Sequence, residues 1–304
     1  MKQRRAVTTK MDKKNSSQTA LSHLPLLTSN NYYQERAYMD VSSFKPFLQC
    51  EAAAYAKYHD QYKPSKPKSG LDPLIFGNFI HSYFESDESH KAFLQKPDVI
   101  DEMHTHKSNG EVTEKLKQAY SEDGLANRMI KTLEDEPLFD DLYMPGDKEV
   151  IVTGEINGFA WKGKIDSLNL ERGYFCDLKT VDDLLKKHWI EGKHYPVSFA
   201  EERGYFMQIA LYQELIYQNY NKWLQPFIFA VSKQDVPDHD LYDFDTDEIR
   251  EILDEQIETI KDKQQRVFNV IKGNVEPTRC EHCEYCRATK KLTGSTHITD
   301  IELR

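Results

Sequence analysis

The stretch that most constrains the fold is a run of strand-like residues between positions 149 and 180. The segment E-V-I-V-T-G-E-I-N-G-F-A-W-K-G-K-I-D-S-L-N-L is rich in β-branched residues and alternates apolar with polar ones. Its N-G pair at 157–158 is typical of a tight hairpin turn. A second turn at E-R-G leads into the strand Y-F-C-D-L-K-T. The sequence therefore predicts a sheet that begins with two consecutive hairpins.

Helix-like segments lie on both sides of this region in the sequence. Ser42 or Ser43 is placed to cap a first helix, in which Phe44, Phe47, Leu48 and Ala52 recur at helical spacing and which includes Cys50. We expect further helices over 74–85, 114–120, 126–135, 203–217 and 245–273, and a buried strand over 226–232. This order predicts an α/β fold, a mixed central β-sheet flanked by helices.

Composition limits the class of protein. The 304 residues suffice for one large core, and we expect a flexible arm over 1–29 followed by a single domain over 30–304. No apolar run has the length of a membrane helix, and M-K-Q-R-R-A-V-T-T-K lacks the apolar core of a secretory signal, so we expect a cytoplasmic protein. The net charge of −10 excludes a polybasic coat, although a local groove can still be positive.

The second hairpin brings two acids together. Asp166 and Asp177 are equally far from a turn centred on Glu171 and Arg172, so they face each other across the strands. Facing Cβ atoms lie about 4.5–5.5 Å apart, and like charges at that distance destabilise the pair unless a cation offsets them. Mg²⁺ prefers such oxygen ligands. Lys179 shares the face of Asp177 and is placed to orient a water or to stabilise a phosphate.

Two other features support a site at this position. Gln208 and Tyr212 are one helical turn apart on the helix that follows the hairpin, and His81 lies on an earlier helix. Each of these motifs also has an ordinary explanation. The hairpin acids can be solvated surface residues, Gln208 and Tyr212 can be polar residues of an amphipathic helix, and His81 can be structural. The four motifs occur in the order H, G-K-I-D, D-L-K and Q-x-x-x-Y.

That order resembles the PD-(D/E)xK nuclease superfamily, in particular its RecB-like group and the phage and prophage recombination exonucleases of the RecE type. The resemblance covers roughly residues 38–292, from S-S-F-K-P-F-L-Q-C to the C-terminal cysteines. Ile165 stands where the family's name has proline, and Asp177 stands where many members have glutamate.

The resemblance implies a restriction-endonuclease-like core and a Mg²⁺- or Mn²⁺-dependent hydrolysis of phosphodiesters. It places His81, Asp166, Asp177 and Leu178 at the metal, and it gives catalytic roles to Asp166, Asp177, Lys179, Gln208 and Tyr212. It further implies 5′–3′ resection of double-stranded DNA ends, a single-strand annealing recombinase as partner, and a ring-shaped homo-oligomer.

Two other functions stay open. A CRISPR-adaptation or repair nuclease would use the same chemistry on single strands or flaps, and a non-catalytic DNA-binding module would keep only the fold. Basic residues near the proposed site in the sequence are candidates for DNA contacts, or else ordinary surface charges: Lys162, Lys164, Lys186, Lys187, Lys193 and Arg203.

The chain ends in a second candidate metal site, C-E-H-C-E-Y-C. Cys280, Cys283 and Cys286 follow the C-x₂-C-x₂-C spacing of ferredoxins, and Cys50 is a natural fourth thiolate. In the nucleases that this chain resembles, an early cysteine and a C-terminal triplet hold a [4Fe–4S] cluster, so we favour iron–sulfur over Zn²⁺. Cys176 alternates away from Asp177 and is expected in the core.

Overall fold

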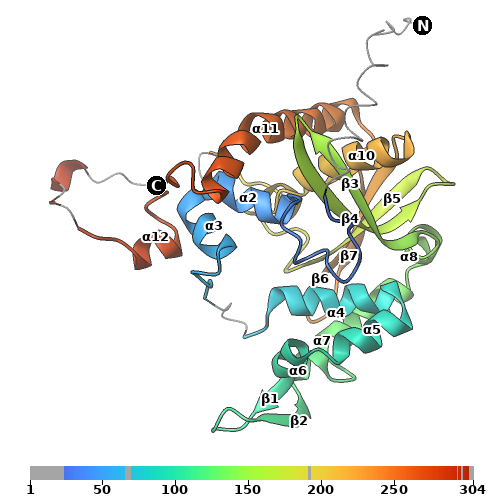
Figure 1. The fold of residues 1–304 in the computed structure, drawn as a ribbon. Helices are drawn as coiled ribbons and strands as arrows, with labels where there is room; N and C mark the ends of the chain where they lie inside the picture. Colours follow the sequence, from blue (N-terminus) through green and yellow to red (C-terminus); the bar gives the residue numbers. More distant parts are fainter. Residues whose placement is uncertain (1–23, 66–69, 191–192, 293, 296, 301–304) are drawn as a thin grey trace, which may run out of the picture.

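The computed structural model describes residues 24–65, 70–190, 193–292, 294–295 and 297–300. Its central sheet contains β3 (Asp147–Ile156), β4 (Phe159–Asn169), β5 (Tyr174–Val181), β6 (Gln225–Ser232) and β7 (His239–Asp243), in that spatial order (Figure 1). β5 and β6 are parallel and the other neighbours are antiparallel. The mixed sheet flanked by helices is confirmed.

Both hairpins form at the predicted turns. Asn157 and Gly158 have φ values of 48° and 84°, the left-handed conformation that a two-residue hairpin requires, and they join the Ile156–Phe159 pair. β4 and β5 pair through Asn169 and Tyr174, as a turn centred on residues 171 and 172 requires. The register of the two hairpins could therefore be read from the sequence.

One face of the sheet is covered by α2 (Val41–Gln49), α10 (Tyr205–Tyr220) and α11 (Asp247–Ile271). Trp161 of β4 is fully buried at this interface, and the centroid of its ring system lies 5.1 Å from that of Phe44 in an edge-on arrangement. Its indole N–H donates to Gln264 Oε1 at 3.0 Å, which joins the sheet to α11. This core fixes α10 and α2 over the strands that carry the acids.

The other face packs against α4 (Pro73–Glu85), α7 (Leu125–Glu134) and α8 (Pro137–Leu142). Cys176 is buried there, as expected, beside Leu178 and Phe229. α5 (Asp87–Leu94), α6 (Pro97–Met103) and the hairpin of β1 (His104–His106) and β2 (Val112–Leu116) extend this layer away from the sheet (Figure 1). The sequence did not predict α5, α6, α8, β1 or β7.

The first predicted helix differs from expectation at both ends. Asp40, and neither Ser42 nor Ser43, caps α2 by accepting from the backbone N–H of Ser43 at 2.8 Å. Cys50 does not lie inside a helix. It is extended, with φ −157° and ψ 104°, and separates α2 from α3 (Glu51–Tyr58). Phe44, Phe47 and Ala52 of the predicted apolar positions are buried, whereas Leu48 is exposed.

The predicted helix over 114–120 is wrong. Residues 112–116 form strand β2, and residues 118–120 form a short 3-10 helix. Pairing with β1, supported by a 2.6 Å hydrogen bond between the hydroxyls of Thr105 and Thr113, outweighs the local helical pattern. The helix expected over 126–135 is confirmed as α7.

The N-terminal arm is described only in part, because residues 1–23 lie outside the described residues. Leu27 is buried against Tyr32 and Tyr38, so this part of the segment packs on the domain. The remaining short elements are α9 (Phe199–Glu202), α12 (Glu284–Ala288) and a 3-10 turn at 298–300. Among the described helices, none is both long enough and apolar enough to span a bilayer.

Replacing Trp161 by Ala should destabilise the fold by about 3–5 kcal/mol, because the cavity and the loss of the indole donor act together. Urea unfolding followed by circular dichroism measures this. Trp189→Ala is the matched control, since Trp189 is 68% exposed, and it should change stability by about 0.5 kcal/mol at most. Equal stability of both variants would contradict the assigned core.

Candidate active site

The two predicted acids lie where β4 and β5 separate. The hydrogen-bonded ladder ends at the pair Ser167–Cys176, and the same register places Asp166 opposite Asp177. Both aspartates are buried. Asp166 does not continue the ladder: its Oδ2 accepts a hydrogen bond from the Leu178 backbone N–H at 2.7 Å. The predicted facing pair therefore exists, with one carboxylate turned into the gap between the strands.

Lys179 lies beside Asp177 as predicted. Its Nζ is 2.5 Å from Asp177 Oδ2 and 4.7 Å from the centre of the Tyr205 ring. Burial by itself lowers the pKa of Lys179, but the Asp177 carboxylate outweighs this effect and raises it. The ammonium therefore stays protonated at neutral pH and acts as a fixed cation.

Gln208 reaches Asp177 from α10, and Tyr212 supports Gln208 from the next turn of that helix. Gln208 Nε2 donates to Asp177 Oδ1 at 3.3 Å and to the Tyr212 hydroxyl at 2.8 Å. The Tyr212 ring packs closely over Gly163, where an added Cβ would lie 2.8 Å from a ring carbon. This close approach explains the glycine in G-K-I-D. The hydrogen bonds between Tyr212 and Gln208 and between Gln208 and Asp177 let α10 position the Asp177 carboxylate.

His81 approaches Asp166 from α4. Its Nδ1 lies 3.5 Å from Asp166 Oδ2. Burial lowers the pKa of His81, which keeps the imidazole neutral at pH 7. Neutral imidazole is the form that binds metal ions. The structure thus brings the histidine, both acids, the lysine and the Q-x-x-x-Y pair together, and their catalytic roles stay predictions.

Glu149 is a site residue that the sequence analysis missed. It lies on β3 between the pairs Lys148–Ser167 and Val150–Ile165, which places it opposite Asp166. Its φ of 55° is rare for a residue other than glycine, and such strain, of order 1–3 kcal/mol, accumulates at functional sites. The N-G turn gave the signal that could have found it, because 149 and 166 are equally far from that turn.

This donor set fits a divalent cation. His81, Glu149 and Asp166 each offer a ligand atom, and these atoms lie within 4.8 Å of one another. Burial and the neighbouring Asp177 raise the pKa of Asp166 from 3.8 to about 7, and burial and Asp166 raise that of Glu149. Asp177 Oδ2 is buried and accepts no hydrogen bond, in spite of its contact with Lys179. A cation would offset this crowding of negative charge.

Leu178 was predicted at the metal, and its surroundings limit what it can do there. Its side chain is fully buried in the core on the opposite face of the sheet, and its backbone N–H is occupied by Asp166. Any ligand atom from this residue would have to be the backbone carbonyl oxygen.

The predicted DNA-contacting lysines differ in their surroundings. Lys162 is buried, and its ammonium donates to the carbonyls of Tyr32 and Glu35 at 2.5 and 2.8 Å, so it is a structural residue and not a surface contact. The other five have different environments: Lys164 pairs with Glu149, Lys193 with Glu201 and Arg203 with Glu202, whereas Lys186 and Lys187 are exposed.

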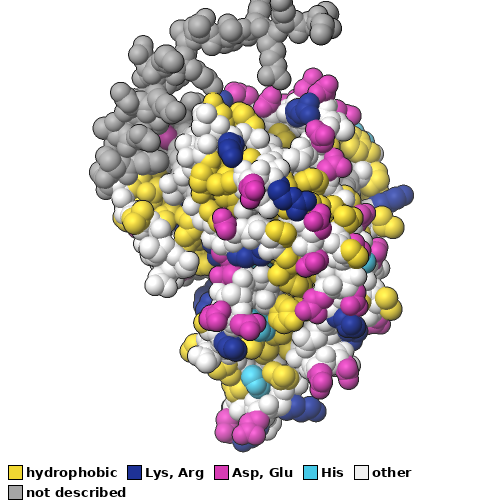
Figure 2. All heavy atoms as spheres, turned by 90° about the vertical axis from the view of Figure 1, so that its right-hand side faces the viewer, with side chains coloured by type: hydrophobic (Ala, Val, Ile, Leu, Met, Phe, Trp, Pro, Cys, Tyr) yellow, Lys and Arg dark blue, Asp and Glu magenta, His cyan; other side chains and the backbone are white. Residues whose placement is uncertain are grey.

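The molecular surface is mixed in charge. On the face in Figure 2, acidic, basic and hydrophobic side chains are interspersed, and the described residues form no broad basic area there. With a net charge of −10, attraction of an anionic substrate depends on local positive groups at the site itself.

The second predicted metal site is also assembled. Cys50, Cys280, Cys283 and Cys286 bring their four Sγ atoms within 4.8 Å of one another. The Sγ of Cys286 is 3.6 Å from that of Cys50 and 3.9 Å from that of Cys280. The four thiols join the α2–α3 break to the C-terminal segment, which explains why Cys50 leaves the helix.

Backbone amides point at these thiols. The N–H groups of Cys283 and Cys286 donate to the Sγ atoms of Cys280 and Cys283 at 3.3 and 3.4 Å. Partial burial raises the pKa of Cys280, but hydrogen bonds from the backbone of His282 and Cys283 lower it to about 6. Burial raises the pKa of the other three thiols, Cys50, Cys283 and Cys286, so Cys280 is the one disposed to be a thiolate, the form that binds metals.

The raised pKa of Asp166 predicts a pH dependence of stability. A carboxyl group whose pKa is higher in the folded protein contributes stability at low pH, and this contribution is lost as the pH rises through about 7. In EDTA, the melting temperature should therefore fall between pH 6 and pH 8. Asp166→Asn should flatten this decline, and Mg²⁺ should raise the wild-type melting temperature more at pH 8 than at pH 6.

Differential scanning fluorimetry at both pH values, with and without Mg²⁺, measures the effect. Asp235→Asn is the control, because Asp235 is fully exposed. If the profiles of Asp166→Asn and the wild type coincide, the assignment of this buried acid fails.

Known proteins agree with this fold. Residues 40–289 match the family described as "PDDEXK-like domain of unknown function (DUF3799)". The chain is also similar to the crystal structure of a protein from Eubacterium rectale named "Putative exonuclease", with 31% sequence identity and a TM-score of 0.73. The alignment covers 91% of this chain and 98% of that one. No curated protein matches the chain.

The family match spans all the motifs from Cys50 to Cys286, and the similar structure extends over nearly the whole chain. The chain therefore belongs to the PDDEXK-like family DUF3799, within the PD-(D/E)xK nuclease superfamily.

Proposed function

We propose that this protein is a divalent-metal-dependent exodeoxyribonuclease that resects double-stranded DNA ends. The observation that carries the proposal is the convergence of Asp166, Asp177 and Lys179 with His81 and Glu149 at the point where β4 and β5 separate. A non-catalytic DNA-binding module would not need two buried acids and a lysine at one place, where they cost stability.

His81, Glu149 and Asp166 would hold the cation, with Asp177 beside them. A bound Mg²⁺ or Mn²⁺ supplies a water of lowered pKa and neutralises charge on the scissile phosphate. Among these residues, the neutral imidazole of His81 and the carboxylates of Glu149 and Asp166 provide nitrogen and oxygen donors of the kind that such ions accept.

Lys179 serves as a positioned cation for the phosphate. Because the Asp177 carboxylate keeps it protonated, it can donate to a phosphate oxygen as charge builds up, but it cannot act as the base that removes a proton from water. Gln208 and Tyr212 orient Asp177, which in turn holds Lys179 at 2.5 Å. The α10 side chains are therefore positioning residues in this scheme.

The finer features of the proposal come from the likeness to RecE-type enzymes. They are 5′–3′ polarity, a role in phage-type homologous recombination, a single-strand annealing recombinase as partner, a ring-shaped homo-oligomer and a cytoplasmic location. The name of the similar Eubacterium rectale protein, "Putative exonuclease", supports action at DNA ends.

The test compares end-labelled linear duplex with closed circular duplex in Mg²⁺ and in EDTA. The wild type should degrade only the linear DNA, and only with Mg²⁺. Lys179→Ala and Asp177→Asn should reduce the rate at least 100-fold, because the first removes the cation that faces the phosphate and the second removes the carboxylate that holds this cation in place. Lys107→Ala, at the distant β1–β2 turn, should retain the wild-type rate.

Cutting of the circle or of single-stranded flaps would favour a CRISPR-adaptation or repair nuclease. Degradation at the original rate by purified Lys179→Ala would refute the catalytic assignment. If the wild type binds DNA but does not cleave it in Mg²⁺ or in Mn²⁺, the protein is a non-catalytic DNA-binding module.

For the four cysteines we propose a metal centre that staples the α2–α3 break to the C-terminal segment. The C-x₂-C-x₂-C spacing and the likeness to cluster-bearing nucleases support [4Fe–4S]. One observation favours the alternative, Zn²⁺: thiolates around a single tetrahedral zinc lie about 3.8 Å apart, from a Zn–S length of about 2.3 Å, and the sulfur distances here are 3.6 and 3.9 Å.

Purification without oxygen, followed by absorption spectroscopy and metal analysis, separates these metals. A brown protein with about four irons per chain would establish the cluster, and a colourless protein with one zinc would establish the alternative. Cys286→Ser should remove the metal and lower the melting temperature by several degrees. Cys176→Ala is the matched control, since Cys176 is buried outside the group, and it should retain the metal. Absence of both metals from the wild type would overturn the proposal.

A further inference from the structure

A second lysine lies close to Lys179. Lys45 is a half-buried residue of α2, which packs against α10 and α11. Its Nζ lies 5.8 Å from the centre of the Tyr205 ring, and that ring is also 4.7 Å from Lys179 Nζ. Two ammonium groups that are far apart in the sequence, on α2 and β5, thus share one aromatic side chain at the edge of the acidic site.

The two lysines differ in their partners. Lys179 is paired with Asp177, whereas no carboxylate of the described residues forms an ion pair with Lys45. In the described part of the chain, Lys45 Nζ has one hydrogen-bond acceptor, the Arg203 carbonyl, at 2.5 Å. An ammonium carries three donors, so this contact leaves two of them for another group.

The environment of Lys45 disfavours its charge. Partial burial and the nearby Lys179 lower its pKa to about 8. The backbone makes room for it: Gly204 has φ +64°, and an added Cβ would lie 2.8 Å from Lys45 Cδ. A cation held beside another cation, without a carboxylate of its own, is suited to receiving an anion.

We propose that Lys45 binds a backbone phosphate of the DNA strand next to the scissile phosphate, an inference that rests on the proposed nuclease function. The ammonium groups of Lys45 and Lys179 lie 5.8 and 4.7 Å from the same ring centre, and phosphates recur about every 3.4 Å of helix axis on each DNA strand, so both lysines are close enough together to bind phosphates of one strand. The phosphate would give Lys45 an ion-pair partner, which it does not have among the described residues, while Lys179 keeps Asp177 as its own partner.

A purely structural role is the competing explanation, since the bond to the Arg203 carbonyl ties α2 to the turn before α10. The two explanations predict opposite effects on stability. If Lys45 is held for phosphate, removing its unpaired charge leaves the melting temperature unchanged or raises it. If it is a structural clamp, removal lowers the melting temperature.

The experiment uses Lys45→Met, which keeps most of the alkyl chain, and Lys45→Arg, which keeps the charge. DNA binding is measured by fluorescence anisotropy of a labelled duplex in EDTA over a range of salt, and cleavage is measured in Mg²⁺. Lys45→Met should weaken binding about tenfold and reduce the slope of log Kobs against log[salt] by about 0.9, the loss of one phosphate contact. KM should rise with little change in kcat, and Lys45→Arg should restore most of the affinity.

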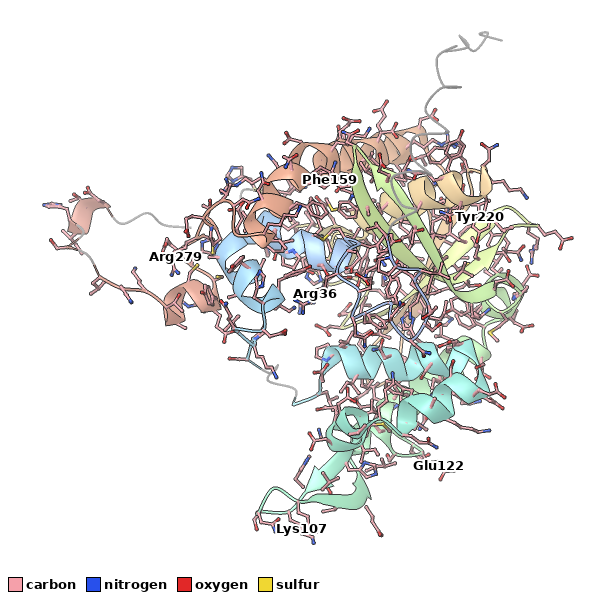
Figure 3. All side chains as sticks on the ribbon, viewed as in Figure 1. Arg36, Lys107, Glu122, Phe159, Tyr220 and Arg279 are labelled. Carbon is pink, nitrogen blue, oxygen red and sulfur yellow. The ribbon has the colours of Figure 1, made fainter. Side chains whose placement is uncertain are left out.

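Lys107→Met is the matched control. Figure 3 shows Lys107 at the end of the molecule farthest from the sheet, in the β1–β2 turn. It should bind DNA with the wild-type affinity and salt slope. Wild-type affinity and slope in Lys45→Met, or a melting temperature several degrees lower that Lys45→Arg does not restore, would overturn the inference. Cleavage by the wild type would then still stand, so the two proposals fail separately.

Two DNA duplexes that differ only at their 5′ ends show whether Lys45 contacts a terminal phosphate or an internal phosphodiester. If Lys45 contacts a terminal phosphate, the effect of Lys45→Met appears on 5′-phosphorylated duplex and disappears on 5′-hydroxyl duplex. If it contacts an internal phosphodiester, the effect is equal on both. Either result supports a phosphate contact, and no effect on either duplex contradicts it.

Discussion

The site depends on the electrostatic repulsion between Asp166 and Asp177, which face each other at the end of the β4–β5 ladder. Two buried carboxylates on facing strands repel each other, and several contacts in the structure offset this repulsion. Asp166 takes the Leu178 N–H and has a raised pKa, and Asp177 is paired with Lys179 and held by Gln208. These arrangements make sense together for a protein that carries a divalent cation at this position.

Several residues at the proposed active site lower the stability of the folded protein. Glu149 adopts a left-handed backbone conformation, and Lys45 and Lys179 bring two positive charges to one tyrosine ring. Neither feature helps the fold. The surrounding core, with Trp161 and the helices on both faces, offsets these costs and holds the groups in a fixed relation. The four cysteines bring the α2–α3 break and the C-terminal segment together at the edge of the domain.

Much of the site could be predicted because tight turns fix register. The N-G and E-R-G turns determine which residues face each other on β3, β4 and β5, and so the Asp166–Asp177 pair followed from counting. Glu149 was open to the same count. The helix over 114–120 was not predictable from its own residues, because pairing with β1 decides its conformation. Cys50 leaves its helix for a similar reason: its thiol meets partners more than 200 residues away.

The sequence by itself determined the registers of the two hairpins, the main helices on both sides of them and the residue types at the two sites, since these follow from local patterns. Only the tertiary structure decided which side chains meet. His81 reaches Asp166 because α4 packs under the sheet, Lys162 turns into the interior, and Lys45 approaches Lys179 through the packing of α2 on α10. Such contacts depend on how helices cross a sheet, and no spacing along the chain encodes that geometry.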